Sequence, residues 1–400
     1  MMFAKRRILF VSEAVTLAHV ARPLVLAQAL SKEGYEVHFA CPDSQTHWLK
    51  GQAIQHWPLN CISTEQFIGA LGRGVPPYTK RILESYVEED LRILDELKPD
   101  LVVGDFRLSL TVSCPLRGVP HANICNAYWS PYCSDLSYPL PDHPAIRFIG
   151  LTAMSALFRV MAPFFLGRHA RVYNELRRAH GLPELGDLRS IYTHGDHVLY
   201  ADIPSLVSLI DLPANHHFIG PILWSPPVDL PEWWGQDGKR SIYVTLGSSG
   251  DASLLDRILD ALIAMPYEVM VATGSRVIPH IKAANIKVAD YLPGIEAAAR
   301  ACLIICNGGS PTVYQALSQG KPILGIPANM DQFLNMRGVE QAQSGILLRT
   351  QHAKPARLRA VVRELLEDSV YRNNARRLGE EVVRYPSGHL LTELVEQWIG

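Results

Sequence analysis

The chain has 400 residues, 48% of them hydrophobic, which is enough for a sizeable core. This length favours two domains over one. Its formal net charge of -1 argues against nucleic acid as the main partner and gives no broad attraction to anionic membranes. The seven scattered cysteines contain no Cys-x-x-Cys pair, which favours reduced thiols. Because the start also lacks a cleavable signal peptide, we expect a cytoplasmic protein, and peripheral contact with the inner face of the membrane stays open.

Short apolar strands alternate with helices through the first half of the chain. Such a rhythm predicts a parallel sheet with helices on both faces. The first strand is followed by a polar loop that contains His19, and a later strand ends at Asp105. The expected strands are 7–11, 36–40, 54–58, 101–105, 121–124, 198–200 and 217–219. Two of the expected helices span 78–97 and 146–180, and two others end at residues 34 and 116.

Residues 126–144 show neither helical nor strand periodicity and are rich in Tyr, Trp, Ser and Pro. Long irregular loops are often functional, so aromatic lining of a ligand site and packing over the sheet are equally good explanations. The apolar stretch 146–166 is interrupted by arginines and small polar residues. A spanning helix needs roughly 20 apolar residues. We therefore expect a buried or amphipathic helix that packs on the core, with lipid contact as the lesser alternative.

A segment rich in proline and tryptophan, 221–238, predicts an interdomain linker. Beyond it the alternation of strands and helices restarts, so we expect an α/β protein of two Rossmann-like domains that face a central cleft. The predicted domains are 1–220 and 239–385, and a C-terminal helix, 386–400, packs back on the first domain. The expected strands of the second half are 241–246, 268–272, 286–288, 303–306 and 322–327, with helices at 252–265, up to 301, at 310–320, 355–367 and 371–384.

The stretch 303–345 carries the strongest local signal for a ligand. An apolar strand is followed by Asn307-Gly308-Gly309, and Ser310-Pro311 then suits the N-cap and first position of a helix. Two glycines let the backbone approach a ligand, and a helix start offers free N–H groups with partial positive charge, which suits a diphosphate. Asp331-Gln332, expected in a loop after the next strand, could bind hydroxyl groups. An ordinary strand-to-helix turn beside a solvated loop explains this stretch equally well.

The ordered set of motifs resembles a known family. The set consists of Ala18-His19-Val20 to Pro23, Asp105, Leu246-Gly247-Ser248, Tyr291-Leu292-Pro293, Asn307-Gly308-Gly309-Ser310 and Asp331-Gln332-Phe333-Leu334-Asn335. In this order, and across nearly the whole chain, it is similar to glycosyltransferases of the GT-B fold, in the family of macrolide and antibiotic glycosyltransferases and UDP-glycosyltransferases.

The resemblance implies that the second half binds a nucleotide-sugar. It places Tyr291 against the base, where the family usually has tryptophan, and Leu292 at the base edge. Gln315 stands where an acidic residue usually holds the ribose. The diphosphate and sugar would be bound by Gly247, Ser248, Asn307, Gly308, Gly309, Ser310, Asp331 and Gln332. The family commonly has His at position 307 and Gln at position 294, where this chain has Asn307 and Gly294, and its His-to-Pro spacing near residue 19 is one residue shorter.

The resemblance also implies that His19 is the catalytic base and Asp105 the acid that orients it. Histidine suits this role because its pKa lies near neutrality, and a carboxylate on its other ring nitrogen fixes the tautomer. Helix N-termini can stabilise the departing diphosphate, and the chain has no Asp-x-Asp motif, so we expect inverting transfer without a metal or other cofactor. A zinc site at His194, His197, His216 and His217 is a weak alternative, because the spacing lacks cysteine or carboxylate partners.

The expected activity is transfer of a sugar from a UDP- or dTDP-sugar to a hydroxyl of a hydrophobic small molecule or lipid. Two alternatives of the same fold remain. A nucleotide-sugar epimerase would change the donor without any acceptor, and a non-catalytic helper protein would only activate a partner transferase. The acceptor itself is not encoded in any recognisable pattern of residues 126–166.

Overall fold

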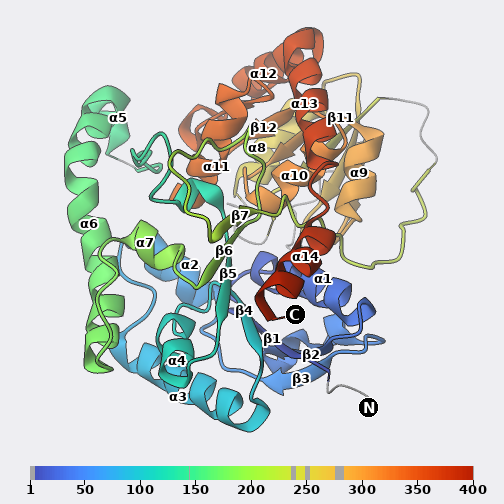
Figure 1. The fold of residues 1–400 in the computed structure, drawn as a ribbon. Coiled ribbons are helices and arrows are strands. Elements are labelled where there is room, and N and C mark those ends of the chain that lie inside the picture. Colours follow the sequence, from blue (N-terminus) through green and yellow to red (C-terminus); the bar gives the residue numbers. More distant parts are fainter. Residues whose placement is uncertain (1–4, 144, 236–239, 248–252, 275–282, 400) are drawn as a thin grey trace. The chain divides into compact units, whose positions relative to one another are not determined.

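The computed structural model describes residues 5–143, 145–235, 240–247, 253–274 and 283–399. Contacts divide the chain into two compact units, each with one parallel sheet and helices on both faces (Figure 1). The first unit contains the chain up to Leu136, Val160–Ile222 and the chain from Tyr385 onward, and the second contains Ser137–Arg159 and Leu223–Arg384. Residues 137–159 thus group with the second unit, although they lie between two parts of the first in sequence.

The first unit is built on a seven-stranded sheet in the order β3-β2-β1-β4-β5-β6-β7. Chain order reverses between β1 and β4, whose last paired residues are Ser12 and Asp105. In open parallel sheets, ligands bind beside the carboxyl ends of strands at such a reversal. The strands are β1 (Arg7–Ser12), β2 (Glu36–Cys41), β3 (Gln55–Pro58), β4 (Leu101–Asp105), β5 (His121–Cys125), β6 (His197–Tyr200) and β7 (His216–Phe218).

Helices cover both faces of this sheet because successive strand side chains point to opposite sides. Ile8 and Phe10 of β1 belong to one buried cluster with residues of α1 and α14, whereas Leu9 and Val11 pack with residues of α3 and α4. The helices are α1 (Ala18–Lys32), α2 (Thr64–Gly72), α3 (Lys80–Leu97), α4 (Leu110–Arg117), α7 (Leu188–Tyr192) and α14 (Ser387–Ile399), with 3-10 turns at Asp43–Leu49 and Ala127–Trp129, and α6 (Leu151–Ala179) contributes from Val160 onward.

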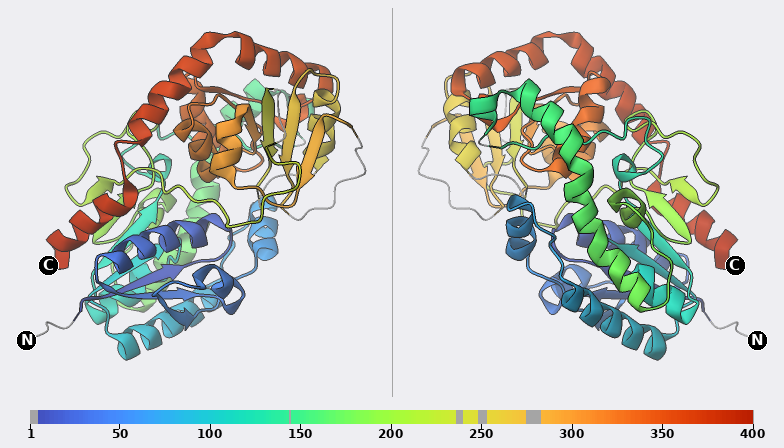
Figure 2. Two further views of the ribbon diagram at one scale, coloured as in Figure 1. Left: turned by 90° about the vertical axis from the view of Figure 1, so that its right-hand side faces the viewer. Right: turned by 90° about the vertical axis from the view of Figure 1, so that its left-hand side faces the viewer.

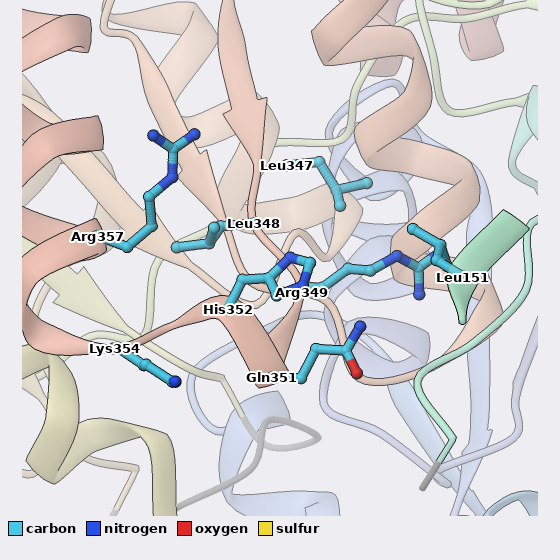
Figure 3. A pocket seen from close by; sticks show the side chains of 8 residues that line it. All are labelled: Leu151, Leu347, Leu348, Arg349, Gln351, His352, Lys354 and Arg357. Atoms are coloured by element: carbon cyan, nitrogen blue, oxygen red, sulfur yellow. The ribbon is translucent and has the colours of Figure 1, made fainter. Parts of the chain in front are cut away.

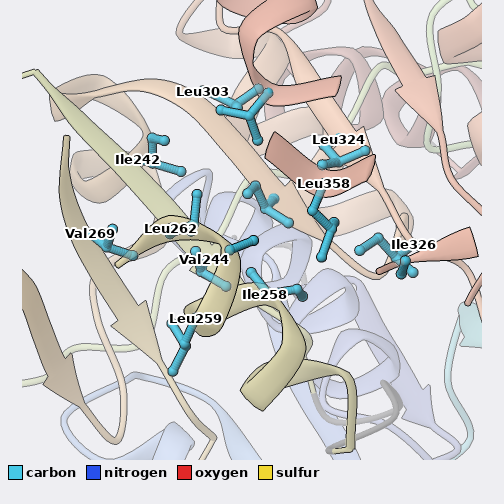
Figure 4. Packing of buried hydrophobic residues seen from close by; sticks show 14 of the residues in the cluster. Ile242, Val244, Ile258, Leu259, Leu262, Val269, Leu303, Leu324, Ile326 and Leu358 are labelled. Carbon is cyan, nitrogen blue, oxygen red and sulfur yellow. The ribbon is translucent and has the colours of Figure 1, made fainter. Parts of the chain in front are cut away.

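The second unit has a six-stranded parallel sheet in the order β10-β9-β8-β11-β12-β13. Its order reverses between β8 and β11, where Thr245 pairs with Cys306. Ile242, Val244 and Leu303 point from these strands into a buried cluster with α8 and α12 (Figure 4). The strands are β8 (Ser241–Thr245), β9 (Glu268–Ala272), β10 (Ile286–Ala289), β11 (Ala301–Cys306), β12 (Ile323–Gly325) and β13 (Gly345–Leu347). The helices are α5 (Ile146–Ile149), α8 (Ser253–Leu262), α9 (Gly294–Arg300), α10 (Ser310–Ser318), α11 (Met330–Gln341), α12 (Pro355–Glu367) and α13 (Ser369–Val382), with a 3-10 turn at Thr350–His352.

The two parallel α/β sheets confirm the predicted fold class, but three local expectations were wrong. Asp331 and Gln332 lie in the first turn of α11 and not in a loop. The N-cap of α10 is Gly309, so Ser310 and Pro311 are its first two residues. The expected helix at 146–180 breaks at Gly150, which has φ +85°.

The stretch 146–166 was expected to pack on the core. In the structure, much of it is exposed. The long helix α6 can be followed in the right-hand view of Figure 2. Its side chains Leu157, Val160 and Phe164 are 54%, 75% and 62% exposed. Among the residues that the structure describes, no helix is both long and apolar enough to cross a bilayer.

Candidate functional site

His19 and Asp105 meet at the reversal point of the first sheet. Asp105 is the last residue of β4, and His19 lies in the first turn of α1, which follows β1 after a short loop. The His19 Nδ1 atom is 2.7 Å from Oδ1 of Asp105, and the Ser12 hydroxyl donates to the His19 carbonyl at 2.6 Å. The two residues that the resemblance paired are therefore in direct contact.

Arg22 completes this arrangement from the same face of α1, three residues after His19. Its Nε and Nη2 atoms donate to the two oxygens of Asp105 at 2.8 and 2.7 Å, a bidentate geometry that orients the carboxylate firmly. Its Nη1 donates to Oδ1 of Asn126 at 2.8 Å, and Asn126 in turn donates to Asp202 at 3.1 Å. Asp105 is thereby fixed by a buried polar network as well as by its strand.

The electrostatics of Asp105 follow from these contacts. The residue is fully buried, and burial raises the pKa of its carboxyl, but Arg22 and His19 together lower that pKa more, so it lies below its ordinary value. The carboxyl is therefore ionised at neutral pH. An ionised carboxylate can accept a hydrogen bond from Nδ1–H of His19, the tautomer in which Nε2 is an acceptor.

Phe106 holds the His19 ring from the other side. The two rings are stacked with centroids 4.8 Å apart and 15° between their planes. Phe106 has φ +60°, a conformation that is rare and costly for a bulky residue. Such strain persists where surrounding structure enforces it, commonly at functional sites. The bend directly after Asp105 thus brings an aromatic ring against the imidazole.

The second group of predicted residues gathers at the reversal point of the other sheet. Gly247 follows β8 and has φ +59°. Asn307 follows β11, and its Nδ2 atom would lie 3.4 Å from a Cβ added at Gly247. Oδ1 of Asn307 accepts a hydrogen bond from the Gly309 N–H at 3.2 Å. Asn307 therefore shapes the turn that leads into α10. Ser248, also predicted here, lies outside the described residues.

The two adjacent glycines have different structural roles. Gly308 has φ +78°, and a Cβ there would lie 2.4 Å from the side chain of Met336 in α11, so the position accepts only glycine without rearrangement. Gly309 has an ordinary extended backbone with φ -67°. The atom nearest to a Cβ added there would be Oδ1 of Asn307, at 3.3 Å. Gly308 therefore makes the turn and packs on α11, whereas Gly309 caps α10.

Asn335 of α11 supports this turn through its side chain, whereas the Gln332 side chain bonds within the loop that precedes α11. Oε1 of Gln332 accepts from the Ala328 N–H at 2.8 Å, and Nδ2 of Asn335 donates to the Gly308 carbonyl at 2.8 Å. Both residues are buried, while Asp331 is only half-buried. Of the two residues predicted to bind the sugar, Asp331 is the more accessible, and Gln332 has an internal partner for its oxygen.

Tyr291, Leu292 and Gln315 form the remaining part of the predicted donor site. Tyr291 is 43% exposed, as a stacking residue requires, and Leu292 is buried. A Cβ at Gly294 would lie 2.4 Å from Oε1 of Gln315, so the glycine makes room for that side chain. Nε2 of Gln315 donates to the Trp224 carbonyl at 2.7 Å. The two departures from the family pattern at 294 and 315 are therefore neighbours in space.

The histidines considered for zinc are packed among aromatic rings. His197 stacks on Trp398 of α14 with centroids 3.7 Å apart, and His216 lies 2.7 Å from the Tyr200 hydroxyl. Burial lowers the pKa of His194 and His216 to about 4. Within the described ranges, no group of three or more His, Cys, Asp or Glu is placed to hold a metal.

Sequence reasoning missed Arg22, Asn126 and Phe106. The sequence placed His19 in a loop, whereas α1 begins at Ala18; only a helix predicted to begin before His19 would have put Arg22 beside it, at a spacing of three. Asn126 and Phe106 had no such signal, since their positions depend on the ends of neighbouring strands.

Comparison with known proteins finds glycosyltransferases among the relatives of this chain. Residues 256–398 match the family model for the C-terminal domain of erythromycin biosynthesis protein CIII-like proteins. The chain is 47% identical to a PGL/p-HBAD biosynthesis glycosyltransferase of Mycobacterium tuberculosis over 94% of this chain and 88% of that protein. It is also 47% identical to a PGL/p-HBAD biosynthesis rhamnosyltransferase of Mycobacterium bovis, covering 94% of this chain and 84% of that protein.

A solved structure shares the fold over almost the full length. Spinosyn rhamnosyltransferase SpnG in complex with thymidine diphosphate superposes with a TM-score of 0.70 at 20% identity, over 98% of this chain and 100% of SpnG. This likeness shows the GT-B architecture of two Rossmann-like domains. The two relatives at 47% identity show that the chain belongs to the family of the PGL/p-HBAD biosynthesis glycosyltransferases, which this likeness places in the GT-B fold.

Proposed function

We propose that this glycosyltransferase moves a sugar from a nucleoside diphosphate donor to a hydroxyl group of a lipid-like acceptor, with inversion at the anomeric carbon and without a metal ion. The observation that carries the proposal is the contact between His19 and Asp105 at 2.7 Å, at the carboxyl edge of the first sheet. Inversion requires the acceptor oxygen to attack opposite the departing diphosphate, and a base must remove its proton.

His19 is the base in this proposal. With Nδ1–H donated to Asp105, Nε2 can accept the proton of the acceptor hydroxyl. The His19 side chain is 19% exposed, so the ring is held by its neighbours and still reachable. Stacking on Phe106 restricts the ring plane and reduces the freedom lost in reaching the reactive geometry.

Arg22 limits what Asp105 contributes to this chemistry. Because the guanidinium already neutralises the carboxylate, Asp105 provides less charge stabilisation to a protonated His19 than a lone carboxylate would. Its main role is then to fix the tautomer and direction of the ring, as carboxylates do in hydrolase triads. Arg22 is a positioning residue that keeps Asp105 ionised and aligned.

The leaving diphosphate would be stabilised at the start of α10. Nine residues of helix follow Gly309, and the first backbone N–H groups of a helix carry partial positive charge. Pro311 has no N–H and the Gly309 N–H is donated to Asn307, so Ser310 and Thr312 would supply the backbone donors. Backbone donors and a helix end can stabilise a diphosphate without a metal.

Gln315 favours a thymidine donor over a uridine donor. Its amide is committed to the Trp224 carbonyl, so it is poorly suited to replace an acidic residue that holds ribose hydroxyls. Thymidine diphosphate has a deoxyribose and lacks the 2′-hydroxyl, so it loses nothing by this change. The SpnG complex with thymidine diphosphate and the relative named as a rhamnosyltransferase support a dTDP-deoxysugar donor.

The relatives named for PGL/p-HBAD biosynthesis support an acceptor of the phenolic glycolipid class. Under this proposal the reacting group is a hydroxyl on a phenolic lipid or on a sugar already attached to it. Such a molecule joins a polar reacting end to a long apolar part, which agrees with the hydrophobic acceptor expected from the sequence.

The experiment is a donor and product analysis with the purified protein. We expect dTDP to raise the melting temperature more than UDP, and Gln315→Glu to narrow this preference, because a carboxylate can bind the 2′-hydroxyl of UDP. NMR of the product formed from a dTDP-sugar and a phenolic acceptor should show the inverted anomer. A retained anomer, or stronger stabilisation by UDP than by dTDP, would contradict the respective part of the proposal.

A further inference from the structure

The second unit exposes an apolar surface on α5 and the start of α6. Phe148 is 87% exposed, and Ile149, Leu151 and Leu157 are 53%, 36% and 54% exposed. Single exposed apolar residues are ordinary, but a group on one short segment marks an interaction surface. We call these four residues the α5–α6 surface. Farther along α6, in the first unit, Val160, Phe164 and Phe165 are also exposed.

The segment that carries this surface is positively charged. Residues 143–159, in the second unit, contain two arginines and no acidic residue. This local excess contrasts with the net charge of -1 for the whole chain. A helix that combines exposed aliphatic and aromatic residues with basic residues, and no acidic ones, has the composition of interfacial membrane helices.

A basic cavity adjoins the α5–α6 surface through Leu151. The cavity has a volume of about 540 Å³ and lies where β13 leads into α12 (Figure 3). Arg349 at its wall is bound to Asp142 at 2.8 Å and to the Leu140 carbonyl at 2.9 Å. The lining residues are Leu151, Leu347, Leu348, Arg349, Gln351, His352, Lys354 and Arg357, none of them acidic.

The other cations of this cavity are placed where an anion would stabilise them. Lys354 is the N-cap of α12 and Arg357 lies in its first turn, which contains no acidic residue. Cations at a helix N-terminus face the positive end of the helix dipole, an arrangement that is unfavourable without a counter-ion. Among the described residues, neither Lys354 nor Arg357 forms a recorded ion pair. Their charged groups point away from each other (Figure 3), so each offers a separate site where an anion could bind in the cavity.

We propose that the second unit docks on a bilayer that contains anionic phospholipids. The four apolar side chains of the α5–α6 surface enter the boundary between headgroups and acyl chains, and lipid phosphates bind at the cationic side chains that line the cavity. Charge favours a bilayer over a second copy of the chain, because two such basic surfaces would repel each other. The inference does not depend on the sugar transfer proposed above, and docking would hold the enzyme where lipid acceptors are found.

Vesicle flotation with the full-length protein tests this proposal. We expect binding to vesicles of phosphatidylcholine mixed with phosphatidylglycerol, much weaker binding to pure phosphatidylcholine, and loss of binding at high salt. The double variant Phe148→Ser/Leu157→Ser should bind at least about tenfold more weakly because it loses buried apolar area. Val383→Ser is the matched control, since Val383 is 76% exposed elsewhere in the second unit and should leave binding unchanged.

The basic cavity needs its own variants. Lys354→Gln/Arg357→Gln should weaken binding by about tenfold and flatten its dependence on salt, whereas Arg363→Gln, an exposed change farther along α12, should change it little. All variants alter exposed side chains and should therefore keep the wild-type melting temperature. Measuring this temperature will show that they fold. The proposal is overturned if the wild-type protein does not float, if the control variants lose as much binding, or if the apolar variant instead abolishes self-association measured by light scattering.

Discussion

At the scale of single residues, the most consequential contact is the bidentate pair of Arg22 and Asp105. Asp105 is fully buried, and a buried carboxylate is tolerated only when it is paired and hydrogen-bonded. The pair leaves one oxygen of Asp105 shared with His19. Arg22 and Asp105 therefore stabilise the fold and orient the imidazole through the same contacts.

We predict that Arg22→Met lowers the free energy of unfolding by about 3–5 kcal/mol at pH 7, because it leaves a buried carboxylate without its main counter-charge. The folded pKa of Asp105 lies below its unfolded value of about 3.9, so its ionised form stabilises the protein above that pH. This contribution disappears as pH falls through the folded pKa. The difference between wild type and variant should therefore shrink below about pH 4, as measured by urea unfolding across pH.

Arg177→Met provides the matched control for this pH dependence. Arg177 is also buried, but the hydrogen bonds recorded for it go to the backbone carbonyls of Thr111 and Pro183, which do not titrate. Burial and, after it, the charge of Arg177 lower the pKa of His194, so loss of Arg177 should destabilise the protein at every pH with a pH dependence that follows this histidine and not a carboxylate. Equal pH dependence in both variants would show that Asp105 is not the group that Arg22 stabilises.

At the scale of elements, the turn between β11 and α10 joins folding to ligand binding. We predict that Gly308→Ala costs about 2–4 kcal/mol of stability, because it combines an unfavourable backbone conformation with a clash against Met336. Gly309→Ala should cost about 1 kcal/mol or less, since its φ suits any residue. The added methyl group should instead hinder the approach of a diphosphate to the helix end.

Chemical denaturation and titration with dTDP separate the two effects. Gly309→Ala should unfold nearly as wild type but bind dTDP at least about tenfold more weakly, a loss of about 1.4 kcal/mol. If Gly309→Ala binds dTDP normally, the start of α10 is not the diphosphate site. If Gly308→Ala is as stable as wild type, Met336 must move more easily than its packing indicates.

The sequence predicted elements best where burial is continuous. Strand β9 was expected at its observed bounds, because a short apolar run fits a strand buried on both faces. Helix α11 was not recognised, since its first turns carry polar residues that usually indicate a loop. Asn335 is buried there because it bonds to the backbone of the distant turn at Gly308, and Gln332 bonds to the Ala328 N–H just before the helix. Helix α2 was also missed, although Ser63 and Gln66 form a capping box that was present in the sequence.

At the scale of the whole molecule, the rest of the site depends on contacts between distant parts of the chain. Asp142 bonds Arg349 and the Thr350 N–H at 2.8 Å each, across more than 200 residues, and so ties residues 137–159 to the second unit. No local pattern encodes such a contact. The partnership of His19 with Asp105 was predicted through the resemblance, because chain topology in this family places both residues at the same sheet edge, whereas Arg22 and Phe106 required the structure.

The two groups of functional residues belong to different units of the chain. His19, Asp105 and Arg22 lie in the first unit, and the turn from Asn307 to Ser310 lies in the second. If the first group performs proton transfer and the second binds the donor, a change in the first should affect the rate of sugar transfer without affecting nucleotide affinity. This separation makes the central claim directly measurable.

The decisive measurement is the transfer rate and dTDP affinity of His19→Ala beside His47→Ala, which removes an exposed histidine of the same unit. We predict that His19→Ala lowers the rate of sugar transfer by about 10²–10⁴-fold, as expected for loss of a general base, while its Kd for dTDP stays within about twofold of wild type. His47→Ala should match wild type in both. A His19→Ala enzyme that retains its rate, or that loses dTDP binding along with it, would contradict the account.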